Sequence, residues 1–327
     1  MWGALGTSRA APGLARRDVP HVTGSTPRRA AGWLDARALG VASSVSRLAT
    51  LRGLQSAGAL LGAGAWRLRT RAARTTLRNL QLCFPELAAD QRERLARASL
   101  RATGMLACES LAVWSRPLDQ TLTWLRREQG ESVVTRALGA GQGLIVIAPH
   151  IGNWELLNAY LGRTYGLVAM YAAPRNERWQ RLVTRQRARA GGEMVAATTA
   201  GIRTMLRRLA AGHMVGHMPD QVPPRSGGVH APFFGVPALT STLIARLAQR
   251  SGAAVVCAAA LRVADGAGFE LWFDAAPATV GADDVVVGVS AVNAAVERCV
   301  RFAPEQYQWE YKRFKHALDG PGDDYYK

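Results

Sequence analysis

A histidine and a glutamate stand where an apolar run of the sequence gives way to a helical pattern. The segment IVIAPHIGNWELLNAY (145–160) begins with a β-branched run that ends at Pro149, and His150 follows at once. Asn153 is a favoured helix N-cap, so Glu155 falls in the first turn of that helix. We expect its carboxylate to reach back to the imidazole, because a carboxylate on one ring nitrogen makes the other nitrogen a better base. The pair predicts deprotonation of a hydroxyl.

A lone histidine in such a turn is also typical of a hydrogen-bonded structural residue, so the assignment depends on other segments. Two later strand-like runs end in polar pairs, Arg175 with Asn176 and Asp220 with Gln221. Each pair alone fits an ordinary loop or cap. If the strands are parallel, however, both pairs share the sheet edge of His150, where helix N-termini also present free N–H groups. This shared edge predicts a functional site.

Two aromatic residues, Phe233 and Phe234, belong to the segment HAPFFGVPALTSTLIARLAQRSGA (230–253). Proline is favoured in the first turn of a helix, so we expect a helix to begin at Pro237. The two rings fit the wall of an apolar channel and fit a hydrophobic core equally well.

Metal and cofactor chemistry is not predicted. His213 and His217 share a strand face, but the only acid or cysteine near them is Asp220, so they are expected to be structural. The four cysteines lie far apart and are expected to be core or free thiols, as in a reducing compartment. The sequence has no GxGxxG after a strand and no P-loop, which predicts no bound cofactor.

The elements that must position these residues alternate along the chain from about residue 130. Alternating strand-like and helical runs indicate an α/β fold with a mostly parallel or mixed central sheet flanked by helices. Residues 75–114 are expected to be helical, with a break at Pro85. Strands are predicted at 143–148, 166–171, 193–197, 213–218, 253–261 and 269–273, and helices at 153–162, 176–190, 200–211, 238–251 and 286–301.

Positive charge collects at the N-terminal end of the chain. The formal net charge is +17, and residues 1–82 hold thirteen arginines and only two acids. Such an end fits a polyanion, either nucleic acid or the anionic face of a membrane. The uncharged run GLQSAGALLGAGAW (53–66) directly precedes a cluster of arginines. This arrangement favours a membrane, since nucleic-acid binding needs exposed aromatic residues or a groove-reading helix instead.

The length of the same uncharged run indicates how it could bind a membrane. Its fourteen residues fall short of the ~20 that a spanning helix needs. We expect a helix that lies in the membrane interface, with the arginines against anionic headgroups. The alternative is a soluble helix packed on its own domain.

Several motifs carry a resemblance to a known family. HIGNWE is followed by RN after the next strand, then by PDQ, by APFFGVPALTSTLIARL and by the closing APEQYQWEYKRF (303–314), and TLRNLQLCFPEL (76–87) precedes them. In this order and spacing, from about residue 45 to 318, the chain resembles the bacterial lipid A biosynthesis acyltransferases, the lauroyl and myristoyl transferases of the lysophospholipid acyltransferase superfamily. The sequence VPP (222–224) stands where the best-known members have another acid after DQ.

The resemblance implies a membrane-associated acyltransferase without a cofactor. His150 would act as general base, oriented by Glu155, while an acceptor hydroxyl attacks the thioester of an acyl carrier protein directly. The acceptor would be a lipid A precursor, acylated late in its synthesis at the cytoplasmic side of the cell inner membrane. The oxyanion would be bound at a helix N-terminus near Gly152 and Asn153, or by Arg175, which would alternatively hold an acceptor phosphate and be positioned by Asp220. Residues implied in substrate binding are Asn153, Arg175, Asn176, Asp220, Gln221, Phe233 and Phe234.

The expected domain organisation has four parts. Residues 1–35 form a disordered basic extension with no counterpart in the family, 36–82 a membrane-associated helix and arginine cluster, 83–318 the acyltransferase domain, and 319–327 a tail. Two other functions stay open at this point. One is an acyl-CoA-dependent phosphatidylinositol mannoside acyltransferase, and the other is a basic nucleic-acid-binding protein.

Overall fold

The computed structural model describes residues 40–41, 43–171, 187, 189–264, 266, 268–316 and 325–326. Contacts divide the chain into Met1–Gly40 and Val41–Lys327, and the sheet with its helices lies in the second unit. The expected extension 1–35, most of the helix expected at 176–190, and both Arg175 and Asn176 lie outside the described residues.

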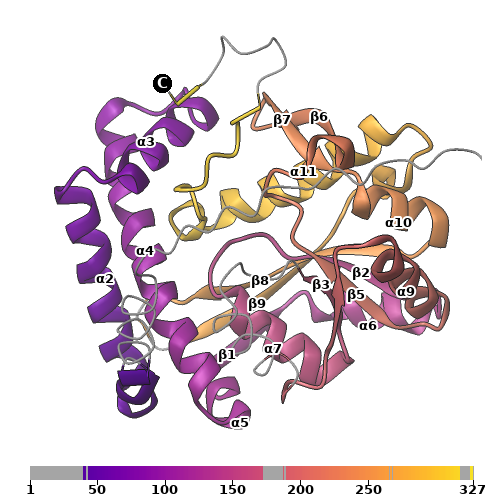
Figure 1. The fold of residues 1–327 in the computed structure, drawn as a ribbon, viewed down its shortest axis with the longest axis horizontal. Helices are drawn as coiled ribbons and strands as arrows, with labels where there is room; N and C mark the ends of the chain where they lie inside the picture. Colours follow the sequence, from indigo (N-terminus) through magenta and orange to yellow (C-terminus); the bar gives the residue numbers. More distant parts are fainter. Residues whose placement is uncertain are drawn as a thin grey trace, which may run out of the picture. The chain divides into compact units, whose positions relative to one another are not determined.

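A seven-stranded sheet forms the centre of the fold, in the order β1-β9-β8-β2-β5-β3-β4 (Figure 1). Strands β8, β2, β5, β3 and β4 run parallel to one another, whereas β9 is antiparallel to β8 and β1 runs parallel to β9. All six predicted strands are present, so the predicted α/β fold with a mostly parallel sheet is confirmed. The strands are β1 (Leu125–Gln129), β2 (Leu144–Ile147), β3 (Val168–Tyr171), β4 (Glu193–Ala196), β5 (Met214–His217), β8 (Ala254–Arg262) and β9 (Phe269–Ala275).

Helices cover both faces of this sheet, because its central strand is apolar on both sides. In β2, Leu144 and Val146 pack with residues of α6 and α7, whereas Ile145 and Ile147 pack with residues of α9, α10 and α11. A strand buried on both faces reads as a continuous apolar run, as LIVI does. These helices are α6 (Glu131–Gly139), α7 (Trp154–Tyr165), α9 (Thr199–Ala210), α10 (Leu243–Ser251) and α11 (Val285–Phe302), and short 3₁₀ turns lie at Arg225–Gly227, Ala278–Gly281 and Pro304–Gln306.

The N-terminal helices α2 (Leu51–Arg67), α3 (Arg71–Cys83), α4 (Ala89–Ser115) and α5 (Leu118–Leu122) precede the sheet. Figure 1 shows α2, α3 and α4 side by side. The predicted break at Pro85 is confirmed, since α3 ends at Cys83 and α4 begins at Ala89.

Glycines let α2 approach α4 closely. A Cβ on Gly58 would lie 2.4 Å from the carbonyl oxygen of Gly104, and one on Gly104 would lie 2.1 Å from the carbonyl oxygen of Gly58. One face of α2 is therefore packed on its own domain, as the alternative reading expected. Its other face exposes Leu60 and Leu61 to 74% and 63%. Across the described residues, every helix is too short or too polar to cross a bilayer.

A β-hairpin replaces the first part of the helix expected at 238–251. Strand β6 (Gly228–Phe233) pairs antiparallel with β7 (Val236–Ser241), and α10 begins only at Leu243. The expected helix start at Pro237 is therefore wrong. Phe234 and Gly235 form the two-residue turn with φ of 51° and 76°, and a turn with two positive φ angles returns the chain as a hairpin.

Candidate active site

The pairing of β2 with β5 brings His150 beside Asp220. Ile147 and His217 are register partners at the ends of these parallel strands, and each chain continues for three residues to reach His150 and Asp220. His150 and Asp220 each follow the end of their strand by three positions, and the two strands are adjacent and parallel. The shared sheet edge that the sequence predicted is therefore confirmed for these two residues.

Asp220 holds His150 at two points. Its Oδ1 lies 2.8 Å from the imidazole Nδ1, and its Oδ2 accepts a 2.8 Å hydrogen bond from the backbone N–H of His150. The carboxylate is 2% exposed and the imidazole 15%. Burial alone would raise the pKa of Asp220, but the charge and hydrogen bonds of His150 outweigh it, so this pKa lies below its ordinary value. An ionised carboxylate on Nδ1 directs the lone pair of a neutral imidazole to Nε2.

Nε2 of His150 faces Gln221, and Gln221 in turn lines a cleft. The side-chain Nε2 of Gln221 lies 3.0 Å from this ring nitrogen, and the indole ring of Trp154 packs edge-on with its centroid 5.1 Å from that of the imidazole. Gln221 also lines a cleft of about 540 Å³ between α9, α10 and the 221–224 loop. The side chain that lies at the nitrogen suited to act as a base is thus also part of the cleft wall.

The loop that carries His150 is fixed by backbone hydrogen bonds on both sides. Gly152 N–H donates to the carbonyl of Gln306 and Asn153 N–H to that of Ala260, while the His150 carbonyl accepts from Gln308. Gly152 has φ of 59°, and a Cβ there would lie 2.1 Å from the Ala260 oxygen. The N–H groups of Gly152 and Asn153 themselves are not free to bind an oxyanion, since both already donate within the protein, and the expected oxyanion contact at the helix N-terminus near them stays a prediction.

Asn153 caps helix α7, as its residue type predicted. Its Oδ1 accepts from Leu156 N–H at 3.0 Å, its Nδ2 donates to Glu109 Oε2 at 3.2 Å, and the residue is fully buried. Both polar ends of the side chain are engaged inside the protein. The structure therefore places Asn153 behind the loop rather than in contact with a substrate.

Sequence reasoning missed a buried ion pair beneath this loop. Arg262 donates to both carboxylate oxygens of Glu109, at 2.7 and 2.6 Å, and Gln55 of α2 donates to the same carboxylate at 3.0 Å. The side chains of Glu109 and Arg262 are 0% and 7% exposed. The available signal was a glutamate among the apolar residues of MLACESLAVW (105–114) and an arginine that closes an apolar strand.

Glu155 does not lie against the imidazole. Its carboxylate pairs instead with Arg187, with Oε1 2.5 Å from Nη2 and Oε2 3.3 Å from Nε, and it is 5% exposed. The expected contact between the Glu155 carboxylate and the His150 ring is therefore corrected: Asp220 lies at Nδ1, and Gln221 lies at Nε2. Asp220 correspondingly holds His150, whereas it was expected to position Arg175.

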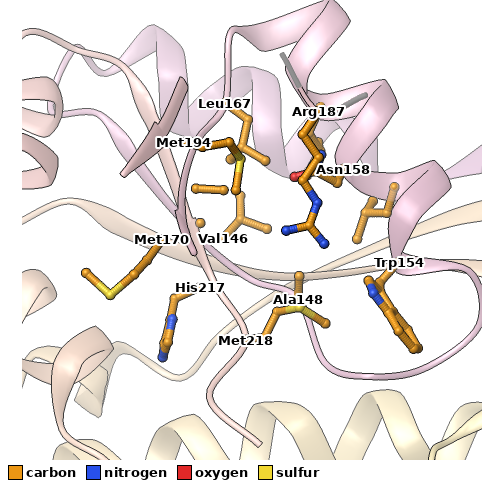
Figure 2. A pocket seen from close by; sticks show the side chains of 14 residues that line it. Val146, Ala148, Trp154, Asn158, Leu167, Met170, Arg187, Met194, His217 and Met218 are labelled. Atoms are coloured by element: carbon orange, nitrogen blue, oxygen red, sulfur yellow. The ribbon is translucent and has the colours of Figure 1, made fainter. Parts of the chain in front are cut away.

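A second, smaller cavity of about 50 Å³ lies between α7 and the sheet. Figure 2 shows the guanidinium of Arg187 extended into it, with Met170, Met194 and Met218 around it. Met170, His217 and Met218 line both this cavity and the larger cleft. Burial lowers the pKa of His217 to about 4, so this imidazole is neutral at pH 7.

Phe233 and Phe234 lie in the core. They are 1% and 8% exposed and belong to a cluster with Phe84, Trp309 and Phe314. Of the two readings of these rings, the structure favours the core over the channel wall, because neither residue lines the two cavities.

The closing motif 303–314 contacts the loops of the site. Val222 N–H donates to the hydroxyl of Tyr311 at 3.0 Å, which holds the loop after Gln221. Burial, and then the nearby carboxylate of Asp220, raises the pKa of the Tyr307 phenol well above its usual range. Within the described part of the chain, no three His, Cys, Asp or Glu side chains converge as metal ligands.

Comparison with known proteins adds the family. A profile described as bacterial lipid A biosynthesis acyltransferase matches residues 26–316. The chain is 30% identical over 243 residues to the lipid A biosynthesis palmitoleoyltransferase of Escherichia coli (strain K12), covering 73% of this chain and 77% of that protein. Identity to the lipid A biosynthesis lauroyltransferase of the same strain is 29% over 262 residues, which cover 80% and 84%. Identity to its lipid A biosynthesis myristoyltransferase is 27% over 273 residues, which cover 80% and 81%.

The match to the family bears on two expectations: the lack of a family counterpart for residues 1–35, and the choice between an enzyme and a nucleic-acid-binding protein. Because it begins at residue 26, the end of the segment 1–35 does have a counterpart in the family. Because the family is one of enzymes, the nucleic-acid-binding alternative is set aside. A chain that the family profile matches from residue 26 to residue 316 is a member of that family, and this protein therefore belongs to the bacterial lipid A biosynthesis acyltransferases.

Proposed function

We propose that the protein moves a fatty acyl chain from an acyl carrier protein thioester to a hydroxyl of a lipid A precursor, with His150 as general base. The observation that carries the proposal is the imidazole whose Nδ1 is held by Asp220 while its Nε2 contacts Gln221, a residue that lines a cleft of about 540 Å³. A base fixed at one nitrogen, with a displaceable amide at the other, suits deprotonation of a bound hydroxyl.

In the proposed reaction the acceptor hydroxyl replaces the Gln221 amide at Nε2 of His150. As the hydroxyl oxygen attacks the thioester carbonyl, its proton moves to Nε2. The tetrahedral intermediate then collapses, the carbon–sulfur bond breaks, and the thiolate takes the proton back from the imidazolium. Asp220 stabilises the imidazolium between these steps, since an ionised carboxylate on Nδ1 favours the charged ring.

Direct transfer is proposed because the described side chains at the imidazole do not suit a covalent acyl-enzyme. The described side chains that contact the His150 ring are a carboxylate, an amide and an indole, from Asp220, Gln221 and Trp154. A thiol or hydroxyl nucleophile beside the base is the arrangement that covalent catalysis uses.

Glu155 enters the proposal as a positioning residue that acts through Arg187. Their ion pair is buried beside the smaller cavity, which shares Met170, His217 and Met218 with the cleft. We assign the oxyanion contact or an acceptor phosphate to Arg175, on the basis of its sequence position after β3. Asn176 is proposed with it as a substrate-binding residue on the same basis.

The membrane part of the proposal rests on exposed apolar side chains. Nine large hydrophobic residues are exposed in the described part of the chain, and six of them fall between residues 41 and 68: Val41, Val45, Leu48, Leu60, Leu61 and Leu68. Such a concentration marks an interaction surface. Arginines in and after the same stretch complement anionic headgroups, so we propose that this surface lies on the cytoplasmic face of the inner membrane.

Mass spectrometry of the reaction products tests the proposal. The full-length protein is incubated with acyl carrier protein thioesters or the matching acyl-CoAs, and with a tetraacylated lipid A precursor or a phosphatidylinositol mannoside. We expect a pentaacylated lipid A product from the carrier protein thioester. Product from acyl-CoA and phosphatidylinositol mannoside alone would establish the alternative reaction instead.

The His150→Ala variant tests the general base in the same assay. General-base help is worth about 10²- to 10⁴-fold in rate, so turnover should fall by that factor. Arg136→Ala serves as a control, since Arg136 is an exposed residue of α6, away from both cavities. A His150→Ala variant that keeps more than about a tenth of wild-type turnover would contradict the assigned role.

A further inference from the structure

The cleft that reaches Gln221 carries positive charge along one wall. Arg246 and Arg250 of α10 line it beside apolar side chains such as Leu206 and Val222, and its described lining residues include no carboxylate. A cleft lined by one sign of charge concentrates ligands of the opposite sign. A cavity of this composition therefore fits an amphipathic anion better than a plain hydrocarbon.

The two arginines are spaced to act on one ligand. Residues four apart are neighbours on a helix surface, with Cβ atoms about 5–6 Å apart, and two like charges at this spacing repel each other. Both arginines are exposed, and neither forms an ion pair with a carboxylate among the residues that the structure describes. By contrast, Arg187, Arg208 and Arg262 each pair with a glutamate.

Phosphate is the anion whose chemistry suits this pair. The planar guanidinium fork binds two oxygens of one phosphate, which is the reason arginine is favoured at phosphate sites. Both substrates of the proposed reaction carry phosphate. In the donor it joins the pantetheine arm to the carrier protein, and in the acceptor it is attached to the sugars.

We propose that Arg246 and Arg250 form a phosphate-binding subsite in this cleft, an inference that rests on the proposed function. The subsite anchors one substrate by its phosphate, the apolar walls take hydrocarbon, and the reacting group lies at Gln221, the cleft residue that contacts His150 Nε2. The arginines position the substrate and do not touch the reacting atoms. Their contribution therefore falls on substrate affinity.

Steady-state kinetics of the full-length enzyme test the subsite. In the double variant Arg246→Ala/Arg250→Ala, we expect the apparent KM of one substrate to rise at least about tenfold, with kcat within about threefold of wild type. The double lysine variant should recover only part of this affinity, because lysine keeps the charge but lacks the fork. Arg136→Ala is the matched control on α6, which covers the opposite face of the sheet.

Substrates without the phosphate identify its source. The donor arm compares acyl-4′-phosphopantetheine with acyl-pantetheine, and the acceptor arm compares the tetraacylated disaccharide with and without its phosphates. In one arm, the difference in apparent KM between the wild type and the double variant should vanish when the phosphate is removed from the substrate. That arm identifies the phosphate that the arginines bind. A double variant with the same KM values as Arg136→Ala, or a difference that persists in both arms, would overturn the subsite.

Calorimetric binding separates this inference from the proposed function. Acyl-4′-phosphopantetheine and the tetraacylated disaccharide phosphate are each titrated into the wild type, the double variant and Arg136→Ala, in the absence of the second substrate. Phosphate-dependent binding lost only in the double variant supports the subsite even if the wild type transfers no acyl chain. Normal transfer with unchanged binding in the double variant refutes the subsite and leaves the proposed function intact.

Discussion

Asp220 contacts both the ring and the backbone N–H of His150, so its charge and its shape can be tested separately. Replacing Asp220 with Asn keeps the shape and removes the charge that stabilises an imidazolium. We expect kcat to fall about 10²- to 10⁴-fold, with the KM of the acceptor little changed, because the loss is confined to the transition state. Steady-state kinetics with the carrier protein thioester measure both quantities.

The matched change at the other acid is Glu155→Gln. Breaking a buried ion pair by removing one partner costs about 3–5 kcal/mol, and glutamine keeps part of the hydrogen bonding to Arg187, so we expect a smaller loss of stability. Thermal unfolding should therefore reveal this variant, while its kcat falls less than that of Asp220→Asn. If Glu155→Gln has a kcat as low as that of Asp220→Asn and an unchanged melting temperature, then Glu155 rather than Asp220 orients His150.

His217 predicts how stability depends on pH. Burial lowers its pKa to about 4, whereas an unfolded chain has about 6.5. Between these values the unfolded state binds more protons than the folded state, so stability falls as the pH drops from about 6.5 towards 4. The lowered pKa of Asp220 adds a further loss only below its unfolded value of about 3.9.

Thermal unfolding of His217→Gln between about pH 7 and pH 4.5 checks this prediction. The melting temperature of the wild type should fall more steeply with decreasing pH than that of the variant. Parallel curves for the two proteins would mean that His217 titrates alike in the folded and unfolded states.

At the scale of single residues, the sequence predicts where the site lies better than which side chains meet there. His150, Asp220 and Gln221 come together because they follow adjacent parallel strands, and that relation can be read from strand order. The partner of Glu155 depends on the direction of a side chain on α7, which spacing alone does not define. Glu109 and Arg262 are 153 residues apart, so only the folded chain reveals their pairing.

At the scale of single elements, some strands can be predicted from their sequences and others cannot. The buried strands have long apolar runs, and all six predicted strands exist. The edge strand β1 has the sequence LRREQ, four of whose five residues are exposed, and it offers no hydrophobic alternation to detect. The β6–β7 hairpin was missed because Phe234 takes a positive φ, a conformation that is rare for a bulky residue.

The loop between β2 and α7 gives a prediction at the scale of an element. Gly152→Ala combines a positive φ with a Cβ placed 2.1 Å from the Ala260 oxygen, so the loop must move away from β8. We expect acyl transfer to fall at least about tenfold, since a shift of about 1 Å in a positioning element can cost 10²-fold. The activity assay and circular dichroism distinguish a displaced loop from an unfolded protein.

Gly139→Ala is the control for this substitution. Gly139 ends α6 and has no atom within 4 Å of a Cβ built on it, so alanine should be neutral or slightly stabilising there. Equal activity of the two alanine variants would mean that the geometry of the His150 loop is not critical.

At the scale of the whole molecule, the surface of the described residues is uneven, with most of their exposed large hydrophobic side chains in Val41–Leu68. Replacing Leu60, Leu61 and Leu68 with Ser should weaken binding to vesicles that contain anionic lipid, because each buried CH₂ contributes about 0.8 kcal/mol to membrane association. Co-sedimentation measures the bound fraction. The bound fraction should also fall with added salt, which screens the arginines.

Val286→Ser/Val287→Ser on α11 is the matched control, since these valines are exposed to 42% and 44% and lie outside that surface. The double variant should bind vesicles like the wild type. If the triple leucine variant binds equally well, the membrane contact lies elsewhere on the protein.

The hydrogen bonds of Glu109 tie that surface to the catalytic loop. Gln55 belongs to α2, which carries Leu60 and Leu61, and both Gln55 and Asn153 donate to the Glu109 carboxylate. Asn153 in turn ends the loop that begins at His150. Only three side chains thus separate the helix proposed to rest on lipid from the base proposed to act on it. If α2 rests on lipid as proposed, these hydrogen bonds hold the imidazole at a set height above the bilayer, and we expect acceptor hydroxyls to be selected by how far each one protrudes from the membrane.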